Sequence, residues 1–150
     1  MSWFDWDAVE KQAGLHRFVK VLLARRGLRE IEGEQQRLSL NQLLRRANKA
    51  WHGAKLNQPD WSPQSHSLAL CAEVRKEKLF FHLILNAYWE PLEFELPGRT
   101  GPWRRWIDTS LESPHDIVEW PSAPTVAGRV YRAEPRSVVV LIADAGARKD

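Results

Sequence analysis

The chain has 150 residues, which suffices for one domain of ordinary size but not for a complete (β/α)₈ barrel, which takes about 250 residues. Its 43% apolar and 27% charged residues fit a globular protein with a buried core and exclude an intrinsically disordered chain. The net charge of +3 is too small to indicate a nucleic-acid-binding protein, so no nucleic-acid partner is expected.

The first third of the chain predicts helices. Apolar residues recur at helical spacing as a stripe of Leu15, Phe18, Val19, Leu22 and Leu23. Asp5 or Asp7 can cap this helix and Gly27 can end it. Its polar side carries Lys11, Arg17, Lys20, Arg25 and Arg26, which we interpret as a solvated face. Ser39 and Gln42 form a capping-box pattern, which predicts a short second helix ending at about Asn48.

From residue 49 onward the pattern changes to β-strands. The run 79–89 is rich in aromatic and branched residues, so it is predicted to be the central strand and to form a hairpin with 67–74 through the charged turn 75–78. Further strands are predicted at 92–96, 103–107, 130–133 and 136–143. Short strands separated by turns rich in proline and glycine favour an antiparallel β-sandwich. The fold class is therefore mainly β, with one long and one short helix in front.

The compartment follows from the cysteine count and the apolar runs. A single cysteine, Cys71, permits no intramolecular disulfide, as expected in a reducing compartment. The N-terminal residues are acidic where a signal peptide would be basic, and runs such as 138–143 fall far short of the roughly 20 residues of a membrane span. We expect a cytoplasmic protein with no membrane contact.

Motifs for catalysis and metal binding are lacking in the sequence. We find no glycine-rich phosphate loop, no histidine pair at ligand spacing, no cysteine pair and no G-x-S-x-G. Neither a metal nor a cofactor is therefore expected. Structural roles are expected for four histidines: His16, His66, His82 and His115.

The segment 51–62 crowds aromatic, imidazole, amide and carboxylate groups into a predicted loop. Its candidate ligand-binding residues are Trp51, His52, Asn57, Asp60 and Trp61. Such groups can bind a sugar by ring stacking and hydrogen bonding, but a Pro-Asp-Trp turn can equally be a corner of the fold held by its own side chains. The residues alone leave both interpretations open.

Five segments in fixed order resemble the C-terminal end of bacterial glycogen debranching enzymes of the isoamylase type, within the α-amylase superfamily. They are SWFDWD at 2–7, AWHGAKLNQPDWS at 50–62, FHLILNAYWEPLEFELP at 81–97, WRRWIDTSLESP at 103–114 and YRAEPRSVVVL at 131–141. In that family the first segment leads from the last strand of the catalytic barrel into its final helix, and an antiparallel β-sandwich follows. The resemblance thus implies that residues 1–48 hold the last barrel helix, at 7–26, with a short connecting helix, and that 49–150 form the C-terminal sandwich domain.

The same resemblance implies a function without catalysis. The family hydrolyses α-1,6 branch linkages in glycogen and limit dextrins with barrel carboxylates whose motifs precede the position of Ser2, so no residue here is expected to be catalytic. Asp5 and Asp7 are interpreted as helix-start residues, and Asp60 and Asp108 as turn residues. Because Met1 falls inside the family's barrel region, we expect one of three origins for the chain: a longer protein cut at a domain boundary, a truncated gene product or a free-standing domain.

Two functions remain open at this point. One is a structural and interaction module; the other is a free-standing module that binds α-glucan, such as glycogen or maltodextrin. The second would use Trp3, Trp51, Trp61 or Trp89 as stacking platforms. Trp89 and Trp103 flank strands and are expected in the core, whereas Trp61 is the best candidate for an open ring. We further expect the stripe from Leu15 to Leu23 to fold back onto the sandwich or to mediate self-association with a second copy.

Overall fold

The computed structural model describes residues 6–31, 48–74, 79–99 and 101–144. Two helices, α1 (Asp7–Lys11) and α2 (Ala13–Ile31), precede the strands. The first four strands are β1 (Asn48–His52), β2 (Ser67–Val74), β3 (Leu79–Asn86) and β4 (Leu92–Glu95). They are followed by β5 (Arg104–Asp108), the 3-10 helix η2 (Trp120–Ser122), β6 (Val130–Ala133) and β7 (Ser137–Asp144).

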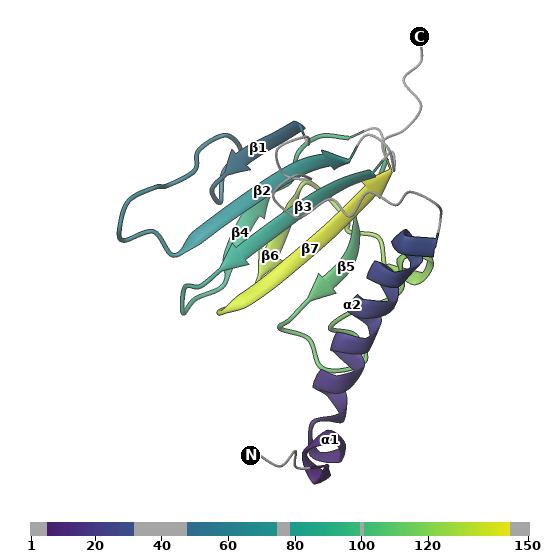
Figure 1. Ribbon diagram of the computed structural model, residues 1–150. Helices are drawn as coiled ribbons and strands as arrows, with labels where there is room; N and C mark the ends of the chain where they lie inside the picture. The colour runs from purple at the N-terminus through teal and green to yellow at the C-terminus, as the bar shows by residue number, and fades with distance from the viewer. Residues whose placement is uncertain (1–5, 32–47, 75–78, 100, 145–150) are drawn as a thin grey trace.

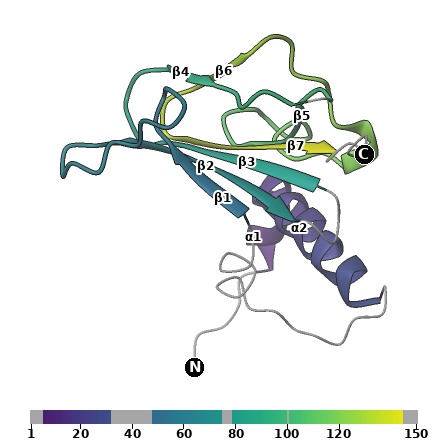
Figure 2. The same ribbon diagram turned by 90° about the horizontal axis from the view of Figure 1, so that it is seen from above.

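In the described part of the chain the strands form two antiparallel sheets. The larger sheet has five strands in the order β1-β2-β3-β7-β5, and β4 pairs with β6 in a smaller one. Figure 2 shows β4 and β6 on one side of the larger sheet and the two helices on the other. The prediction of a mainly β, antiparallel sandwich is confirmed, and β3 is the central strand, in a hairpin with β2.

The core lies between the two sheets because successive side chains of a strand point to opposite faces. On the larger sheet, Ile84 of β3 and Val139 and Leu141 of β7 are fully buried. From the smaller sheet, Phe94 of β4 and Ala133 of β6 close the other side. Burying these aliphatic and aromatic side chains supplies the main stabilisation of the sandwich, at about 1.5–3 kcal/mol for each large one.

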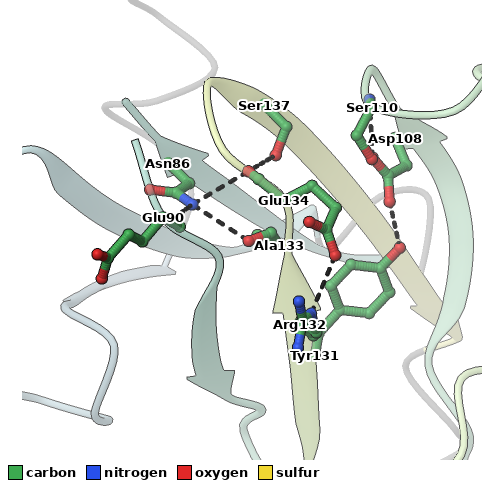
Figure 3. Close-up of polar contacts among 9 residues, drawn as sticks. All are labelled: Asn86, Glu90, Asp108, Ser110, Tyr131, Arg132, Ala133, Glu134 and Ser137. Carbon is green, nitrogen blue, oxygen red and sulfur yellow. Dashed lines mark hydrogen bonds and ion pairs between the residues drawn. The ribbon is translucent and has the colours of Figure 1, made fainter. Parts of the chain in front are cut away.

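A buried asparagine ties the turns of the two sheets together (Figure 3). The Nδ2 group of Asn86, at the end of β3, donates to the backbone oxygens of Glu90 at 3.0 Å, Ala133 at 3.1 Å and Glu134 at 3.0 Å. Its Oδ1 accepts a hydrogen bond from the backbone N–H of Tyr88 at 3.1 Å. Since Asn86 is buried, these bonds satisfy its amide and fix the β3–β4 turn against the β6–β7 turn.

A second polar contact joins β5 to β6 (Figure 3). The hydroxyl of Tyr131 donates to Oδ2 of the buried Asp108 at 2.5 Å. Oδ1 of Asp108 accepts from the backbone N–H of Ser110 at 3.0 Å and from its hydroxyl at 2.6 Å. Burial, followed by the bond to the Asp108 carboxylate, raises the pKa of Tyr131. Both carboxylate oxygens of Asp108 therefore serve the fold.

The N-terminal helix differs from the expected single helix over 7–26. Gln12 leaves the helical conformation and separates α1 from α2, and α2 continues through Gly27 to Ile31, so the predicted stop at Gly27 is wrong. Trp6, not Asp7, occupies the N-cap of α1, and Asp7 is the first helical residue. The predicted short second helix falls on residues that the structure does not describe, up to residue 47. At its expected end, Asn48 is the first residue of β1.

Helix α2 lies beside β5 and the turn that follows it (Figure 1). Arg17 donates to the Ser113 hydroxyl at 2.8 Å, to the Ile117 carbonyl at 3.2 Å and to the Asp116 carboxylate, with which it forms an ion pair. Interpreting Arg17 as part of a solvated face was therefore wrong.

The apolar stripe of α2 is only partly covered by the sandwich. Phe18 and Leu22 are half-buried, whereas Leu15, Val19 and Leu23 are exposed. The helix thus does contact the sandwich, but through the side that carries Arg17, and three of the five stripe residues face away from it.

The strands agree with the predicted ones within a few residues, with one addition. β1 was not predicted; Trp51 and His52 lie in it because they pair with Leu70 and Ala69 of β2. β3 ends at Asn86 rather than at Trp89, and β5 carries a register shift between Arg105 and Ile107. The predicted turn at 75–78 is outside the described residues. Within the described residues, no helix combines the length and the apolar composition needed to cross a bilayer.

Candidate functional site

The loop from β1 to β2 carries most of the candidate residues and is tightly folded at its start. A Cβ atom added to Gly53 would lie 2.3 Å from the carbonyl oxygen of Gln58, so this close approach requires glycine. Asn57 has a φ of 59°, in the left-handed region that asparagine tolerates, and its backbone N–H donates to Nδ1 of His52 at 2.9 Å. The loop thereby folds back onto the end of β1.

The same loop is attached to the smaller sheet. The backbone oxygen of Ala54 accepts from the N–H of Glu95 at 2.8 Å, and the N–H of Leu56 donates to Oε2 of Glu95 at 3.0 Å. These bonds hold residues 53–58 in one conformation and position the segment that follows.

His52 anchors this loop and does not face solvent. The residue is buried, its ring lies 5.8 Å from the ring of the fully buried His82, and burial lowers the pKa of His52. Because its side chain is buried, His52 is not placed to contact a ligand bound at the surface. Trp51 and His52 are consecutive residues of a strand and not of the predicted loop. Their side chains therefore point to opposite faces of the sheet, the imidazole inward and the indole outward.

Trp51 and Trp61 form an exposed aromatic pair. Their ring centroids are 5.5 Å apart with an interplanar angle of 73°, an edge-to-face arrangement. The two side chains keep 40% and 64% of their surface exposed. The prediction that Trp61 has an open ring is therefore confirmed.

Asp60 shapes the turn that carries Trp61. Its Oδ1 accepts a hydrogen bond from the backbone N–H of Ser62 at 2.9 Å, and the bonds with Ser62 lower the pKa of the Asp60 carboxyl. The carboxylate is exposed and charged at neutral pH. It is thus a turn residue, as expected, and at the same time an exposed hydrogen-bond acceptor beside an indole ring.

An open surface groove of about 360 Å³ begins at Asp60 and Trp61 and runs over the ends of β2 and β3. Leu68 and Leu85, which are directly paired across these two strands, form part of it. The remaining lining residues are Ser62, Ser65, His66, Ser67 and Ala87. Of the five candidates from the sequence, the structure brings Asp60 and Trp61 to this groove; Trp51 lies next to it through its contact with Trp61, and His52 and Asn57 do not line it.

A second group of rings lies beside the groove and is connected to it by His66, which lines it. The His66 ring stacks on Tyr88 with centroids 6.2 Å apart and lies 6.2 Å from Trp89. Tyr88 and Trp89 stack on each other at 4.4 Å, and Trp89 is 63% exposed. The expectation that Trp89 belongs to the core was wrong, because β3 ends three residues earlier and the ring lies in the following turn.

The other tryptophans divide between core and surface. Trp103 is 5% exposed, as expected for a core residue, and its Nε1 donates to the Pro97 carbonyl at 3.0 Å. Trp106 and Trp120 are half-buried and lie edge to face, 5.4 Å apart. Trp6 on α1 is 77% exposed, and Trp3 is outside the described residues.

His66 and Tyr88 were not among the candidate residues predicted from the sequence, although the structure places their rings together beside Trp89. His66 was expected to have only a structural role. The available signal was the sequence Tyr88-Trp89 directly before Glu90-Pro91, since proline ends a strand and leaves the rings ahead of it in a turn. Among the described residues, no group of three or more histidine, cysteine, aspartate or glutamate side chains is arranged to hold a metal ion.

Comparison with known proteins identifies the family. The family model described as "Isoamylase 1-3, C-terminal" matches residues 50–137, which is more than half of the chain and spans the sandwich from β1 to the start of β7. A search of curated proteins gives no match. The match supports the resemblance noted in the sequence, and the chain belongs to the isoamylase 1-3 C-terminal domain family.

Proposed function

We propose that this chain acts as a non-catalytic structural module of an isoamylase-type debranching enzyme, which hydrolyses α-1,6 branch linkages in glycogen and limit dextrins. The observation that carries this proposal is the family match over residues 50–137. On this proposal residues 49–150 are the C-terminal sandwich domain, and residues 1–48 belong with the catalytic barrel.

The use of the described carboxylates supports a non-catalytic role. A retaining glycosidase needs two carboxyl groups about 5–5.5 Å apart and directed at the sugar. Here Asp108 is buried and bonded to Tyr131 and Ser110, and Asp116 is paired with Arg17. These side chains hold turns and strands of the sandwich in place, which leaves them unsuited to serve as nucleophile or acid.

Helix α2 supplies the interaction surface of this module. Leu15, Val19 and Leu23 are exposed on the side of α2 that faces away from the sandwich. Leaving these three side chains in water is energetically costly, since full burial of each large apolar side chain stabilises a protein by about 1.5–3 kcal/mol. We propose that the catalytic barrel covers it, so that the module contacts the barrel through α2.

Two measurements test this function. The purified chain should release no reducing ends from glycogen limit dextrin under conditions in which an isoamylase does; measurable release would contradict the proposal. Mixed with the separately produced barrel of an isoamylase-type enzyme, the chain should elute with it in size-exclusion chromatography with light scattering.

The docking contact has a matched control. Leu15→Glu with Leu23→Glu should abolish co-elution, whereas Val130→Glu, an exposed apolar position on the smaller sheet, should preserve it. Separate elution of the unaltered chain, or equal loss with both sets of variants, would refute docking through α2. A homodimer of the unaltered chain that the paired α2 substitutions dissociate would instead support self-association through the stripe.

A second candidate function is a module that binds α-glucan. Specific support comes from Trp51 and Trp61, whose rings are open to solvent at one corner of the sandwich. Binding would retard the chain in native gels that contain glycogen relative to gels without it. Migration that is unaffected by glycogen would eliminate this candidate.

A further inference from the structure

We propose that the groove between Trp61 and the ring cluster of His66, Tyr88 and Trp89 is the binding site for a single α-1,4-linked glucan chain. We call this surface the Trp61–Trp89 groove; it consists of the groove-lining residues described above, which include Trp61 and His66, together with Tyr88 and Trp89, whose rings lie against that of His66 beside the lining. The proposal rests on the second candidate function for the linkage of the sugar. It keeps Asp60, Trp61 and Trp89 from the predicted residues and adds His66 and Tyr88.

The apolar part of the groove suits the faces of pyranose rings. Trp61 and Trp89 are more than 60% exposed, although large aromatic rings are ordinarily among the most buried side chains. Leu85 is also exposed and lines the groove together with its strand partner Leu68. The C–H groups on the two faces of a glucosyl ring pack against exactly such flat or aliphatic surfaces, so two ring clusters offer platforms for separate sugar units.

The polar part of the groove suits hydroxyl groups. Ser62, Ser65 and Ser67 line it, and each hydroxyl can both donate and accept. Asp60 adds a charged acceptor beside Trp61. A neutral ligand that carries many hydroxyls around apolar ring faces matches this combination of groups.

The charge of the lining argues against other ligand classes. Among the described residues that line the groove there is no lysine or arginine to neutralise a phosphate, as binding of a nucleic acid or a phosphorylated ligand requires. Of these lining residues only Asp60 is a carboxylate, so they offer one counter-charge to a basic peptide. A carbohydrate therefore fits the groove better than either class.

One backbone hydrogen bond joins the two segments that line the groove, and others order one of these segments. The N–H of Ala87, in the β3–β4 turn, donates to the carbonyl of His66 at 2.8 Å. In the segment that holds His66, the N–H of Ser65 donates to the carbonyl of Ser62 at 3.0 Å, and Ser62 is bonded to Asp60. Because the backbone of these segments is already ordered, little conformational entropy is lost on binding.

The groove lies away from α2. In Figure 1 the loops from β1 to β2 and from β3 to β4 are at the opposite side of the larger sheet from α2. A glucan at the Trp61–Trp89 groove would therefore leave the exposed row of α2 accessible. Glucan binding and contact with a barrel can occur in the same molecule.

Affinity electrophoresis and calorimetry on the full chain test the proposal. The chain should be retarded in gels containing glycogen and should bind maltoheptaose in isothermal titration calorimetry. Trp61→Ala and Trp89→Ala should each weaken binding by about tenfold, or about 1.4 kcal/mol at 25 °C, because truncation removes one stacking platform. Trp6→Ala, which removes a 77% exposed tryptophan on α1, is the matched control and should bind like the unaltered chain. The thermal midpoints of the Trp61 and Trp89 variants should fall by no more than about 6 °C, since both side chains are largely exposed and each variant loses one aromatic contact.

The possible results separate this proposal from the functions on which it builds. Retardation that is lost in the Trp61 and Trp89 variants and kept in the Trp6 variant supports the groove. Retardation that survives both substitutions overturns the groove but leaves glucan binding elsewhere on the chain. No retardation of the unaltered chain overturns glucan binding altogether, while the structural role through α2 is unaffected. Equal retardation by hydroxyethyl cellulose, a β-1,4-linked polymer, overturns the assignment to α-glucan.

Discussion

Replacing His82 by leucine should remove the part of the acid sensitivity of this domain that comes from its fully buried imidazole. His82 is fully buried on β3, its ring lies 5.7 Å from the Trp103 ring, and neither ring nitrogen has a hydrogen-bond partner among the described residues. Burial, with smaller contributions from the nearby His52 and Arg99, lowers the pKa of His82 from 6.5 to about 3. The folded state therefore holds a neutral imidazole that the unfolded chain would protonate.

The sign and size of the effect follow from this difference in pKa. Because the pKa of His82 is lower in the folded state, its stability contribution is intact above about pH 6.5 and is lost as the pH falls toward 3. At pH 5 about 97% of the unfolded chains but only about 1% of the folded chains carry the proton, which costs about 2 kcal/mol relative to pH 7.5. For a domain of this size that corresponds to a decrease in Tm of roughly 4–8 °C.

Urea unfolding at pH 7.5 and at pH 5.0 measures this difference. Between the two pH values His82→Leu should lose about 2 kcal/mol less of its free energy of unfolding than the unaltered chain loses. At pH 7.5 the variant should be as stable as the unaltered chain or more so, because an imidazole without partners is replaced by an apolar side chain of similar size. His115→Gln, at an exposed turn position, is the control and should leave the pH dependence unchanged. An equal loss of stability in His82→Leu and in the unaltered chain would refute the reasoning.

Three further substitutions test contacts that hold the fold. Tyr131→Phe leaves one oxygen of the buried Asp108 without its bond and should cost about 1–3 kcal/mol in urea unfolding; a loss below 0.5 kcal/mol would be inconsistent with that bond. Gly53→Ala forces the β1–β2 loop to shift and should cost about 1–3 kcal/mol, while Gly98→Ala, where a Cβ meets nothing within 4 Å, should be nearly neutral; equal effects would contradict the close approach. Arg17→Ala should lower the free energy of detaching α2 from the sandwich by about 1 kcal/mol, so that chymotrypsin cuts α2 about fivefold faster. Unchanged cleavage would show that Arg17 does not hold α2 in place.

The strands could be predicted because their signals are local. Aromatic and branched residues at 79–86, alternation at 92–95 and the apolar run at 137–143 each indicate a strand without reference to the rest of the chain. β1 was missed because residues 48–52 carry no such pattern, and they form a strand only through their pairing with β2. The helix predicted over 7–26 is present, but it is broken at Gln12 and continues past Gly27 to Ile31, and neither feature has a clear local signal.

The candidate site was predicted in part, for a related reason. Trp61 and Asp60 belong to a polar turn whose composition already indicates exposure. Whether Trp51, His52 or Trp89 points outward depends on strand alternation and on where β3 ends, so the sequence did not indicate that His52 is buried, and it wrongly placed Trp89 in the core. His66 offered no signal, because its ring partners are more than 20 residues away in the chain.

The sequence by itself determined the class of fold, the order of most strands and, through its motifs, the kinship with isoamylase-type enzymes, since these depend on local patterns and on composition. Only the tertiary structure decided which tryptophans are open and which side chains share a surface. The Trp61–Trp89 groove combines a loop after β1 with a turn after β3, and the two are brought together by the pairing of β2 with β3 and the bond from Ala87 to His66. Such a surface depends on contacts between distant segments, which no local pattern of residues encodes.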